Sequence, residues 1–516
     1  MSGIRRRLQA PVLGGLALTA ILSGCTTVRM LRHREPDALN RNAFPSRPVR
    51  RAATPFQFHR ATSLRNDLDT VTVRDTDGRR IPWSEYMEKH AVLAFLVIRN
   101  DTILYERYRG GLTDSSIHNS FSVAKSVLSA LLGAAIADGS IKSLDQPVTD
   151  FVPELRGRSA FNGVTLRNLL DMESGLRFTK ADGPLYSQIR SDEAHIYYTT
   201  NLVDRIANTP RDMEPGTLWK YKDTDTELLG IAIARATGRS IAAYTEEKLW
   251  SRIGTEHDAT WSLDRKNGQE KVSSGFNATA RDYARFGRLM LERGNWNGLQ
   301  VLPSDWVTRS TAVDTTRKEP EISSWWQMQH AFYWWHPLQP HTGDFYADGS
   351  NGQRVYVDPA SKTIIVQLAN MSDQDFPFRK LTAYLIGATW NYPRFVPGSL
   401  YQAGMRFGVD SIQPIFDRMM HDRERNPESV AITASGMRSA GRLLMDSTKS
   451  REAGIRVLLI ETARNPHIAA GFVELSDAYL RTGDRVRAAE AIGRAVALEP
   501  RNAAIVKKAA ALGVHP

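Results

Sequence analysis

The chain has 516 residues, of which 42% are hydrophobic and 24% are charged. This balance is typical of a folded protein with two or three domains, and it excludes an intrinsically disordered chain. The formal net charge of +11 does not indicate a nucleic-acid-binding face, because residues 1–60 alone carry +9 through eleven arginines against Glu35 and Asp37. A basic tail on a body of only +2 favours targeting and a membrane surface, and no nucleic acid is expected as a partner.

The N-terminus has the pattern of an export signal. Three arginines at 5–7 precede an apolar run at 11–22, which is too short for a comfortable transmembrane helix. The run ends in Leu-Ser-Gly-Cys at 22–25, which resembles the bacterial lipobox, and Cys25 is the only cysteine of the chain. We therefore predict a lipoprotein signal peptide at residues 1–24 and lipidation at Cys25, with an ordinary cleaved signal as the alternative. The protein would face the periplasm from a membrane, and Thr26 favours the outer membrane.

Residues 25–60 are rich in proline and arginine and have no apolar periodicity. This composition predicts a tether whose arginines face anionic head groups, or else a merely solvated linker. With a single cysteine, no disulfide framework and no cysteine-based metal site are expected.

The next segment, residues 61–398, is predicted to be one α+β domain. A run rich in Val, Ile, Leu and Tyr at 91–108, broken at Arg99-Asn100-Asp101, predicts a β-hairpin. An apolar helix is expected from Ser122 to Ala137, and helical patterns dominate residues 166–291. Strands return at 354–358 and 363–368. We therefore expect one antiparallel sheet whose first and last strands meet, with an inserted helical region.

Residues 399–516 are predicted to form an all-α domain. Within 469–502, the spacing of Phe472, Leu475, Tyr479 and Ala488 fits the 34-residue tetratricopeptide pattern, and the preceding period fits it less well. The alternative is an unrelated helical hairpin. A tetratricopeptide-like region would be a possible site for a protein partner.

The first candidate catalytic pair is Ser122 and Lys125 at the start of the apolar helix. A spacing of three places the hydroxyl and the amine on one helix face, within reach of proton exchange. Near a helix N-terminus, Ser122 also has backbone N–H groups beside any oxyanion that forms. A lysine buried among Val123, Val127 and Leu128 would have its ammonium form disfavoured, which suits a base for a serine nucleophile.

Two further motifs follow along the chain. Tyr221 stands beside Lys222 in a Tyr-Lys-Asp sequence, where a neighbouring cation can lower the pKa of a tyrosine enough for proton relay. The sequence Ala-Asp-Gly-Ser-Asn-Gly-Gln at 347–353 leads directly into a predicted strand. Its glycines would let a substrate carbonyl approach the backbone, where the N–H of Ser350 could complete an oxyanion hole. A packing tyrosine and a plain hairpin turn are the alternatives for these two motifs.

The order of the three motifs resembles that of the serine β-lactamase and DD-peptidase superfamily. Residues 165–176 look like its leucine-leucine, serine-glycine-leucine segment, and residues 275–289 with 296–298 are similar to the class C-like branch. The Gly-x-x-Gly-Gln form of the third motif and the run Asp-Thr-Glu-Leu-Leu-Gly at 225–230 most resemble 6-aminohexanoate-dimer hydrolases. The resemblance covers roughly residues 91–391.

The resemblance implies that Ser122 is the acylated nucleophile, Lys125 its proton acceptor and Tyr221 the relay to the leaving group. It also implies an oxyanion hole made by the N–H groups of Ser122 and Ser350. The remaining positions that match the motifs, implied to bind substrate, are Asp223, Gly349, Asn351 and Gln353. No metal or organic cofactor is implied.

This sequence departs from the family pattern at two positions. The third motif usually begins with Lys or His, where this chain has Ala347 and Asp348, so the usual cation for a substrate carboxylate is missing. Asp223 replaces the usual Asn, and its charge would keep Lys125 protonated unless Lys222 or another cation offsets it.

Two features near the third motif each allow two interpretations. Arg354 could contact a substrate carboxylate or serve the structure. Trp334 and Trp335 could line an acyl pocket or pack in the core.

These features together predict a serine hydrolase that cleaves an amide or ester of a small molecule. Short linear amides, carboxylic esters and D-amino-acid peptides all remain open as substrates. The alternative from another class is a weak or inactive scaffold lipoprotein that binds partners through its repeats. A D-alanyl carboxypeptidase fits the location but conflicts with the missing cation of the third motif.

Overall fold

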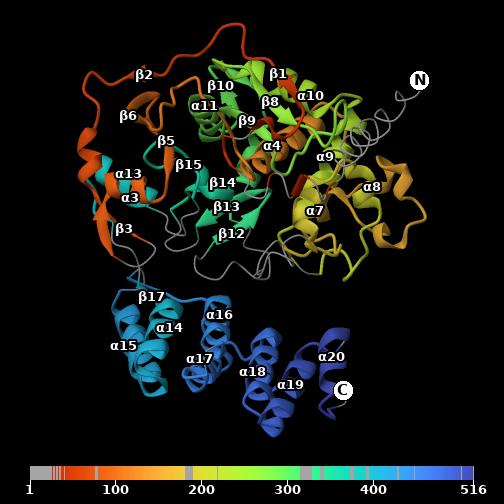
Figure 1. Ribbon diagram of the computed structural model, residues 1–516, viewed down its shortest axis with the longest axis vertical. Coiled ribbons are helices and arrows are strands. Elements are labelled where there is room, and N and C mark those ends of the chain that lie inside the picture. Colours follow the sequence, from red (N-terminus) through yellow and green to blue (C-terminus); the bar gives the residue numbers. More distant parts are fainter. Residues whose placement is uncertain are drawn as a thin grey trace, which may run out of the picture. The chain divides into compact units, whose positions relative to one another are not determined.

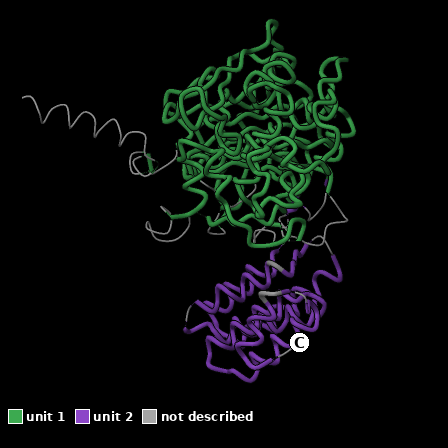
Figure 2. The backbone as a smooth tube through the Cα atoms, turned by 90° about the vertical axis from the view of Figure 1, so that its right-hand side faces the viewer, with its two compact units in different colours: residues 1–316, 330–336, 343–389 green, residues 317–329, 337–342, 390–516 purple. Residues whose placement is uncertain are grey.

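The computed structural model divides into two compact units, of which the first contains residues 1–316, 330–336 and 343–389 and the second the rest (Figures 1 and 2). The signal peptide and Cys25 lie outside the described residues. The structure describes residues 26, 29–30, 33, 37–39, 41–75, 79–180, 190–217, 219–313, 328–337, 342–371, 377–390, 394–426, 429–446, 448–500 and 502–514. Among them, none of the helices has the length and apolar character needed to cross a membrane.

An eight-stranded sheet of order β12-β13-β14-β15-β16-β5-β6-β2 forms the centre of the fold. The expected hairpin is confirmed as β5 and β6, with Asn100 and Asp101 at positive φ in its turn, as tight hairpins require. β16 pairs antiparallel with β5, so the first and last strands meet as predicted. In sheet order the strands are Met328–Ala331, Trp334–Pro337, Phe345–Gly349, Gln353–Asp358, Thr363–Ala369, Val92–Arg99, Thr102–Tyr108 and His59–Arg60.

Alternate residues of the central strands face two helical layers, as the two-residue period of a strand dictates. On one face Phe95 and Tyr356 contact aromatic side chains of α3 (Trp83–Lys89) and α13 (Phe378–Leu385). On the other face, Val355 and Ile364 lie against Gly287 of α11 (Ala280–Leu291), where the missing side chain allows close packing. The prediction of an α+β fold of the β-lactamase type is therefore confirmed.

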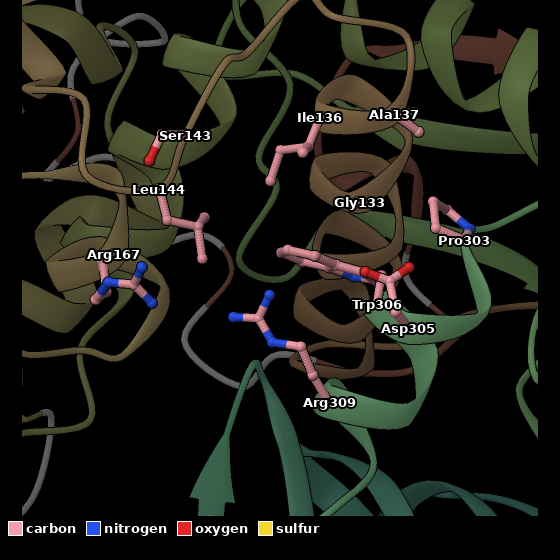
Figure 3. Close-up of a pocket in the computed structure, with 10 residues that line it drawn as sticks. All are labelled: Gly133, Ile136, Ala137, Ser143, Leu144, Arg167, Pro303, Asp305, Trp306 and Arg309. Carbon is pink, nitrogen blue, oxygen red and sulfur yellow. The ribbon is translucent and has the colours of Figure 1, made fainter.

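Helix α4 (Val123–Ala137) is apolar on all sides because it lies inside the first unit, between the sheet and the helices α9, α10 and α12. Gly133 lets Trp306 of α12 pack directly on it, since a Cβ there would lie 2.4 Å from Trp306 Cδ1. Beside this contact, at the C-terminal end of α4, is a pocket of about 370 Å³ into which Arg309 points (Figure 3). No predicted site residue lines this pocket.

A smaller sheet of order β1-β8-β9-β7 leads the chain into α4. β7 pairs with β9 and is followed directly by the turn that carries Ser122. The strands are Ser46–Val49, Ala259–Ser262, Phe276–Thr279 and Ile117–Asn119.

The prediction of a tether from 25 to 60 is wrong for residues 41–60. β1 pairs with β8, β2 pairs with β6, and Phe44, Val49 and Phe58 are buried. The prolines misled the prediction because β1 is an edge strand, where a missing N–H costs little.

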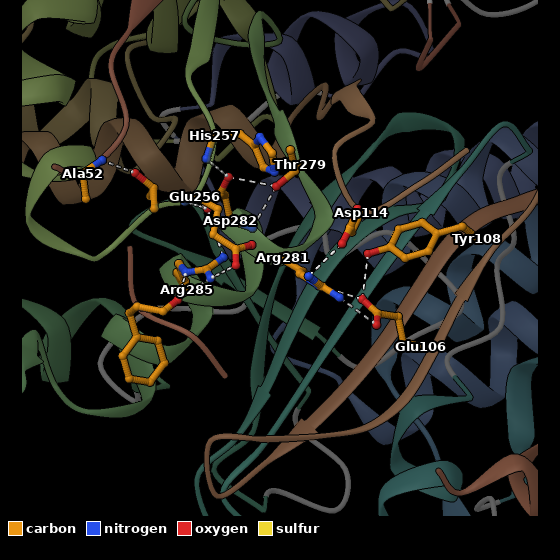
Figure 4. Close-up of polar contacts among 12 residues, drawn as sticks. Ala52, Glu106, Tyr108, Asp114, Glu256, His257, Thr279, Arg281, Asp282 and Arg285 are labelled. Atoms are coloured by element: carbon orange, nitrogen blue, oxygen red, sulfur yellow. Dashed lines mark hydrogen bonds and ion pairs between the residues drawn. The ribbon is translucent and has the colours of Figure 1, made fainter. Parts of the chain in front are cut away.

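Polar contacts fasten this segment to the first unit. The N–H of Ala52 donates to the Thr255 hydroxyl at 3.0 Å. The N–H groups of Glu256 and His257, directly after Thr255, donate to Asp282 of α11 (Figure 4). The buried Arg285 completes the network by bonding the carbonyl of Phe56 and pairing with Glu256 at 3.0 Å. Residues 41–60 therefore belong to the folded first unit.

The first unit also contains further strands and α-helices. They are the strands β3 (Thr72–Arg74), β4 (Arg80–Pro82), β10 (Asn295–Trp296) and β11 (Leu299–Gln300), and the helices α5 (Leu166–Leu170), α7 (Asp192–Tyr198), α8 (Leu202–Ala207), α9 (Asp223–Thr237), α10 (Ile241–Lys248) and α12 (Ser304–Ser310).

From residue 394 on, the described part of the second unit is helical apart from one short strand pair, β17 (Arg394–Phe395) with β18 (Val430–Ala431). Phe472, Leu475 and Tyr479 of the predicted repeat are buried against residues of the following helix, and Gly483 with φ +83° forms the turn between the two helices. The tetratricopeptide assignment stays a prediction. The helices are α14 (Val396–Phe407), α15 (Ile412–Arg425), α16 (Ala434–Met445), α17 (Arg451–Arg464), α18 (Ala469–Arg481), α19 (Arg485–Leu498) and α20 (Ala503–Ala510).

Candidate active site

Ser122 stands in a turn that leaves its hydroxyl available for chemistry. It occupies the N-cap position of α4, yet its side chain makes no capping hydrogen bond. Phe121 before it has φ +45°, a costly conformation for a residue with a side chain. Neighbouring bonds hold the turn, since the N–H of Phe121 donates to Asn119 Oδ1 at 3.1 Å and that of Ser120 to the Phe276 carbonyl at 3.0 Å. The surrounding structure therefore sustains strain beside the predicted nucleophile.

The side chain of Lys125 is buried and reaches the serine from one helical turn away. Its Nζ lies 2.8 Å from Ser122 Oγ, as the spacing of three predicted. The same nitrogen lies 2.9 Å from the Ser273 carbonyl oxygen and 2.7 Å from Asp223 Oδ1. An ammonium group has three N–H donors, and these acceptors use all of them.

The charge of Lys125 differs from the expectation based on burial alone. Burial by itself would lower the pKa of Lys125, but the Asp223 carboxylate and Tyr221 raise it above its ordinary value. Lys222 does not offset this effect, because its Nζ turns away to Ser174 Oγ at 3.2 Å and to Asp225 at 3.7 Å. The resting site therefore holds a lysine ammonium, as the exchange of Asn for Asp suggested.

Tyr221 lies beside both Ser122 and Lys125. Its ring centroid lies 5.0 Å from Lys125 Nζ, and its hydroxyl interacts with the side chains of both Ser122 and Lys125. Burial raises the pKa of Tyr221, and the nearby ammonium opposes that rise. The chain then enters α9 at Asp223, and acidic residues are favourable in the first turn of a helix.

The two tryptophans of β13 have different surroundings. Trp334 is fully buried against Phe286 and Phe345, so it is a core residue. Trp335 stacks on Tyr221, with ring centroids 6.0 Å apart. Of the two candidates for an acyl pocket wall, only Trp335 therefore lies at the site.

The third motif meets the nucleophile at Gly349, the last residue of β14. A Cβ on Gly349 would lie 2.2 Å from the Ser120 carbonyl oxygen and 3.2 Å from the Ser122 nitrogen, so a side chain does not fit there. Ser350 and Asn351 follow in the short 3₁₀ turn η7 (Ser350–Gly352), exposed and half-buried respectively. The turn thus stands beside the first turn of α4, where the oxyanion hole is predicted.

Gln353 does not fit its predicted role as a substrate contact. Its side chain is fully buried, and its amide donates to the Ala369 carbonyl while its oxygen accepts the Ala369 N–H. Arg354 pairs with Asp348 across β14 and β15, with Nε and Oδ1 2.9 Å apart. Both residues therefore support the strands β14 and β15, which flank the third motif.

Sequence reasoning missed the support given by Glu227. Its carboxylate accepts the N–H groups of Val272 and Ser273 at 3.0 and 3.1 Å and the Ser273 hydroxyl at 2.7 Å. These bonds aim the Ser273 carbonyl at Lys125. An acid directly before the apolar run at 228–234 was the available signal, because a buried charge needs several partners. Among the described residues, no cluster of three or more His, Cys, Asp or Glu side chains could hold a metal ion.

Comparison with known proteins agrees with this geometry. The family model described as Beta-lactamase matches residues 84–388, more than half of the chain. The chain belongs to the β-lactamase family. As a member it is a serine hydrolase of the β-lactamase and penicillin-binding superfamily, and the match ends before residue 390, where the main part of the second unit begins.

Individual relatives show which members of the family this chain resembles. The chain is 29% identical to a 6-aminohexanoate-dimer hydrolase of Paenarthrobacter ureafaciens over 60% of this chain and 80% of that protein. It is 25% identical to a β-lactamase of Pseudomonas fluorescens over 32% of this chain and 45% of the relative. A Bacillus anthracis structure provisionally named a 6-aminohexanoate-dimer hydrolase superimposes with a TM-score of 0.60 at 26% identity, over 68% of this chain and 94% of that one. The resemblance seen in the motifs is thus confirmed.

Proposed function

We propose that this family member hydrolyses a linear amide or ester through an acyl-enzyme at Ser122. The observation that carries the proposal is the 2.8 Å contact between Lys125 Nζ and Ser122 Oγ, with the Tyr221 hydroxyl beside both groups. This arrangement supplies a nucleophile, a base in reach of its proton, and a second proton carrier. The names of the relatives support an amide of the 6-aminohexanoate type as the first substrate to test.

The acceptors around Lys125 orient it as a base. When the ammonium loses a proton, its two remaining N–H groups stay with Asp223 and the Ser273 carbonyl, and its lone pair faces Ser122 Oγ. Lys125 then takes the serine proton while Oγ bonds to the substrate carbonyl carbon. The carbonyl oxygen becomes an oxyanion, which the N–H groups of Ser122 and Ser350 would stabilise.

Collapse of the tetrahedral intermediate needs a proton on the leaving group. Lys125 passes its proton through the Tyr221 hydroxyl to the departing amine or alcohol as the bond to carbon breaks. Water then attacks the acyl carbon and gives one proton to the same pair. The bond between that carbon and Ser122 Oγ breaks, the pair returns the proton to Oγ, and the acid product leaves. Asp223 and Glu227 act in this scheme by holding Lys125 and the Ser273 carbonyl in place.

The test compares the full chain with Ser122→Ala after incubation with p-nitrophenyl esters and a fluorophosphonate probe. Intact-mass spectrometry should show one probe adduct on the wild type and none on the variant, and ester turnover should disappear with Ser122. Turnover of 6-aminohexanoate dimer then tests the finer assignment. An adduct or turnover that persists in Ser122→Ala would refute the role of Ser122.

One observation favours the second candidate function, a scaffold with little activity. The ion pair at Lys125 removes the free amine that the base must supply. Absence of both adduct and turnover in the wild type over a wide pH range would favour this candidate. The second unit, as the proposed partner-binding region, would then be used in pull-down experiments.

We also propose that lipidated Cys25 anchors the protein to a membrane with the hydrolase facing the periplasm. The signal sequence and the lone cysteine support this location. Metabolic labelling with an alkyne fatty acid should mark the wild type and not Cys25→Ala, and equal labelling of both would contradict the proposal.

A further inference from the structure

The usual cation for a substrate carboxylate is missing from the third motif, and the structure shows that its neighbours do not replace it. Arg354, the nearest cation along the chain, pairs with Asp348 at 2.9 Å and has only 9% of its side chain exposed. Ala347 occupies the place where a cation is usual, and the acid Asp348 follows it. A carboxylate entering from this side would meet the Asp348 charge.

The other buried lysines around the site are already engaged. Lys125 bonds Ser122, Ser273 and Asp223. Lys222 Nζ donates to Ser174 Oγ and to the Leu176 carbonyl, and it pairs with Asp225.

Lys271 is also engaged elsewhere. Its Nζ donates to the Ile196 carbonyl at 3.1 Å and lies over the rings of Phe44 and Tyr197. It is 1% exposed, so a substrate anion does not reach it from solvent.

Lys180 is different because it is exposed and lies beside the catalytic tyrosine. Its Nζ is 5.8 Å from the centroid of the Tyr221 ring, the same ring that Lys125 approaches at 5.0 Å. Within the part of the chain that the structure describes, Lys180 forms no ion pair with a carboxylate. An available cation and the amine that contacts the nucleophile therefore approach the same aromatic ring.

The backbone before Lys180 is held firmly, so its position is defined by the fold. The N–H and the hydroxyl of Thr179 both donate to Asp192 Oδ2 at 3.0 Å. Asp192 in turn pairs with Arg205, and Phe178 is buried. Lys180 thus directly follows a residue that is hydrogen-bonded to the first residue of α7.

We propose that Lys180 binds the carboxylate of the substrate and so selects anionic linear amides or esters. The inference rests on the proposed function and names its substrate class. The apolar chain of such a substrate would lie along the stacked rings of Tyr221 and Trp335, between the scissile carbonyl at Ser122 and the carboxylate at Lys180. An ammonium over an aromatic ring keeps its charge available to an anion, because the ring accepts no proton and forms no ion pair.

The experiment uses two p-nitrophenyl esters of equal length, the monoester of adipic acid and its methyl-capped neutral counterpart. Wild type, Lys180→Ala, Lys180→Arg and the control Lys266→Ala, an exposed lysine in a turn, are compared in the full chain. Lys180→Ala should lower kcat/KM for the anionic ester about fivefold, mainly through KM, as an exposed ion pair permits. The neutral ester should be unaffected, Lys180→Arg should retain most of the preference, and Lys266→Ala should match the wild type.

Equal losses on both esters in Lys180→Ala, or no loss on either, would overturn the role of Lys180. Binding of adipate to Ser122→Ala, measured by calorimetry with and without Lys180→Ala, separates this inference from the proposed function. If no ester is hydrolysed and adipate still binds through Lys180, the proposed function fails and the carboxylate site stands. If adipate binding does not depend on Lys180, the site is refuted whatever the turnover.

Discussion

At the scale of residues, the substitution of Asp for Asn at position 223 controls the chemistry of the site. The carboxylate lies 2.7 Å from Lys125 Nζ in a buried environment, where an ion pair is poorly screened. It orients the lysine and at the same time stabilises the protonated form that cannot act as a base. The Asp223 carboxylate therefore helps to orient Lys125 but reduces the population of its free amine.

We predict that Asp223→Asn makes the enzyme active at lower pH. The pKa of Lys125 is raised in the folded protein, so the free amine is populated only on the alkaline side, and removal of the carboxylate lowers that pKa. Each unit of decrease raises the population of the base about tenfold at a fixed pH below the pKa. The acid limb of the kcat/KM profile for a p-nitrophenyl ester should therefore move toward neutral pH.

Asn is the matched substitution because it keeps the size and one hydrogen-bond acceptor of the side chain. Asp212→Asn, at an exposed aspartate outside the constellation, serves as the control and should leave the profile unchanged. An acid limb that stays at the wild-type pH in Asp223→Asn would contradict the assignment of Lys125 as the base.

At the scale of elements, the site depends on how closely strand β14 approaches helix α4. The approach occurs at Gly349, where the strand end contacts the carbonyl of Ser120 and the backbone nitrogen of Ser122. Tyr221 and Asp223 arrive from the start of α9, and Ser273 is held by Glu227 from the same helix. Three separate segments of chain thus meet at the N-terminus of one buried helix.

We predict that Gly349→Ala reduces ester hydrolysis at least a hundredfold, because the added methyl group would have to displace the Ser120 carbonyl or the strand. Activity and thermal unfolding should be measured together. Gly493→Ala is the matched control, since Gly493 lies in α19 with its nearest contact at 3.6 Å, and alanine favours a helix. Wild-type activity in Gly349→Ala would show that the third motif does not support the oxyanion.

At the scale of the whole molecule, the described site residues and most of the family match lie in the first unit. The match ends at residue 388, and the second unit continues from 390 to 516 with its own buried cores. The segment at 41–60 belongs to the first unit through strand pairing and the contacts of Arg285. The catalytic unit therefore begins before the family match does.

We predict that a chain ending at Thr389 keeps kcat/KM for p-nitrophenyl esters within about threefold of the full chain, since no described site residue follows that point. A chain beginning at residue 61 should instead unfold at lower temperature, because it loses β1, β2 and the buried Phe44, Val49 and Phe58. Circular dichroism melting and ester turnover check both variants. Loss of activity in a well-folded chain ending at Thr389 would assign the second unit a part in catalysis.

The sequence by itself determined the hairpin, the apolar helix, the strands that return and the order of the three motifs. These follow from local periodicity and spacing, such as the three-residue step from Ser122 to Lys125 that a helix turns into contact. It also identified Asp223 as the residue that would keep Lys125 charged, because that argument needs only proximity and sign.

Only the tertiary structure decided which further groups surround Ser122, Lys125 and Tyr221. Ser273, Trp335 and Lys180 come from segments far apart in the chain, and no local pattern distinguishes them from solvated or core residues. The same holds for Gln353, which sequence reasoning placed at the substrate and the fold placed in the sheet. Local periodicity predicts elements, whereas contacts between distant segments depend on the packing of the whole unit.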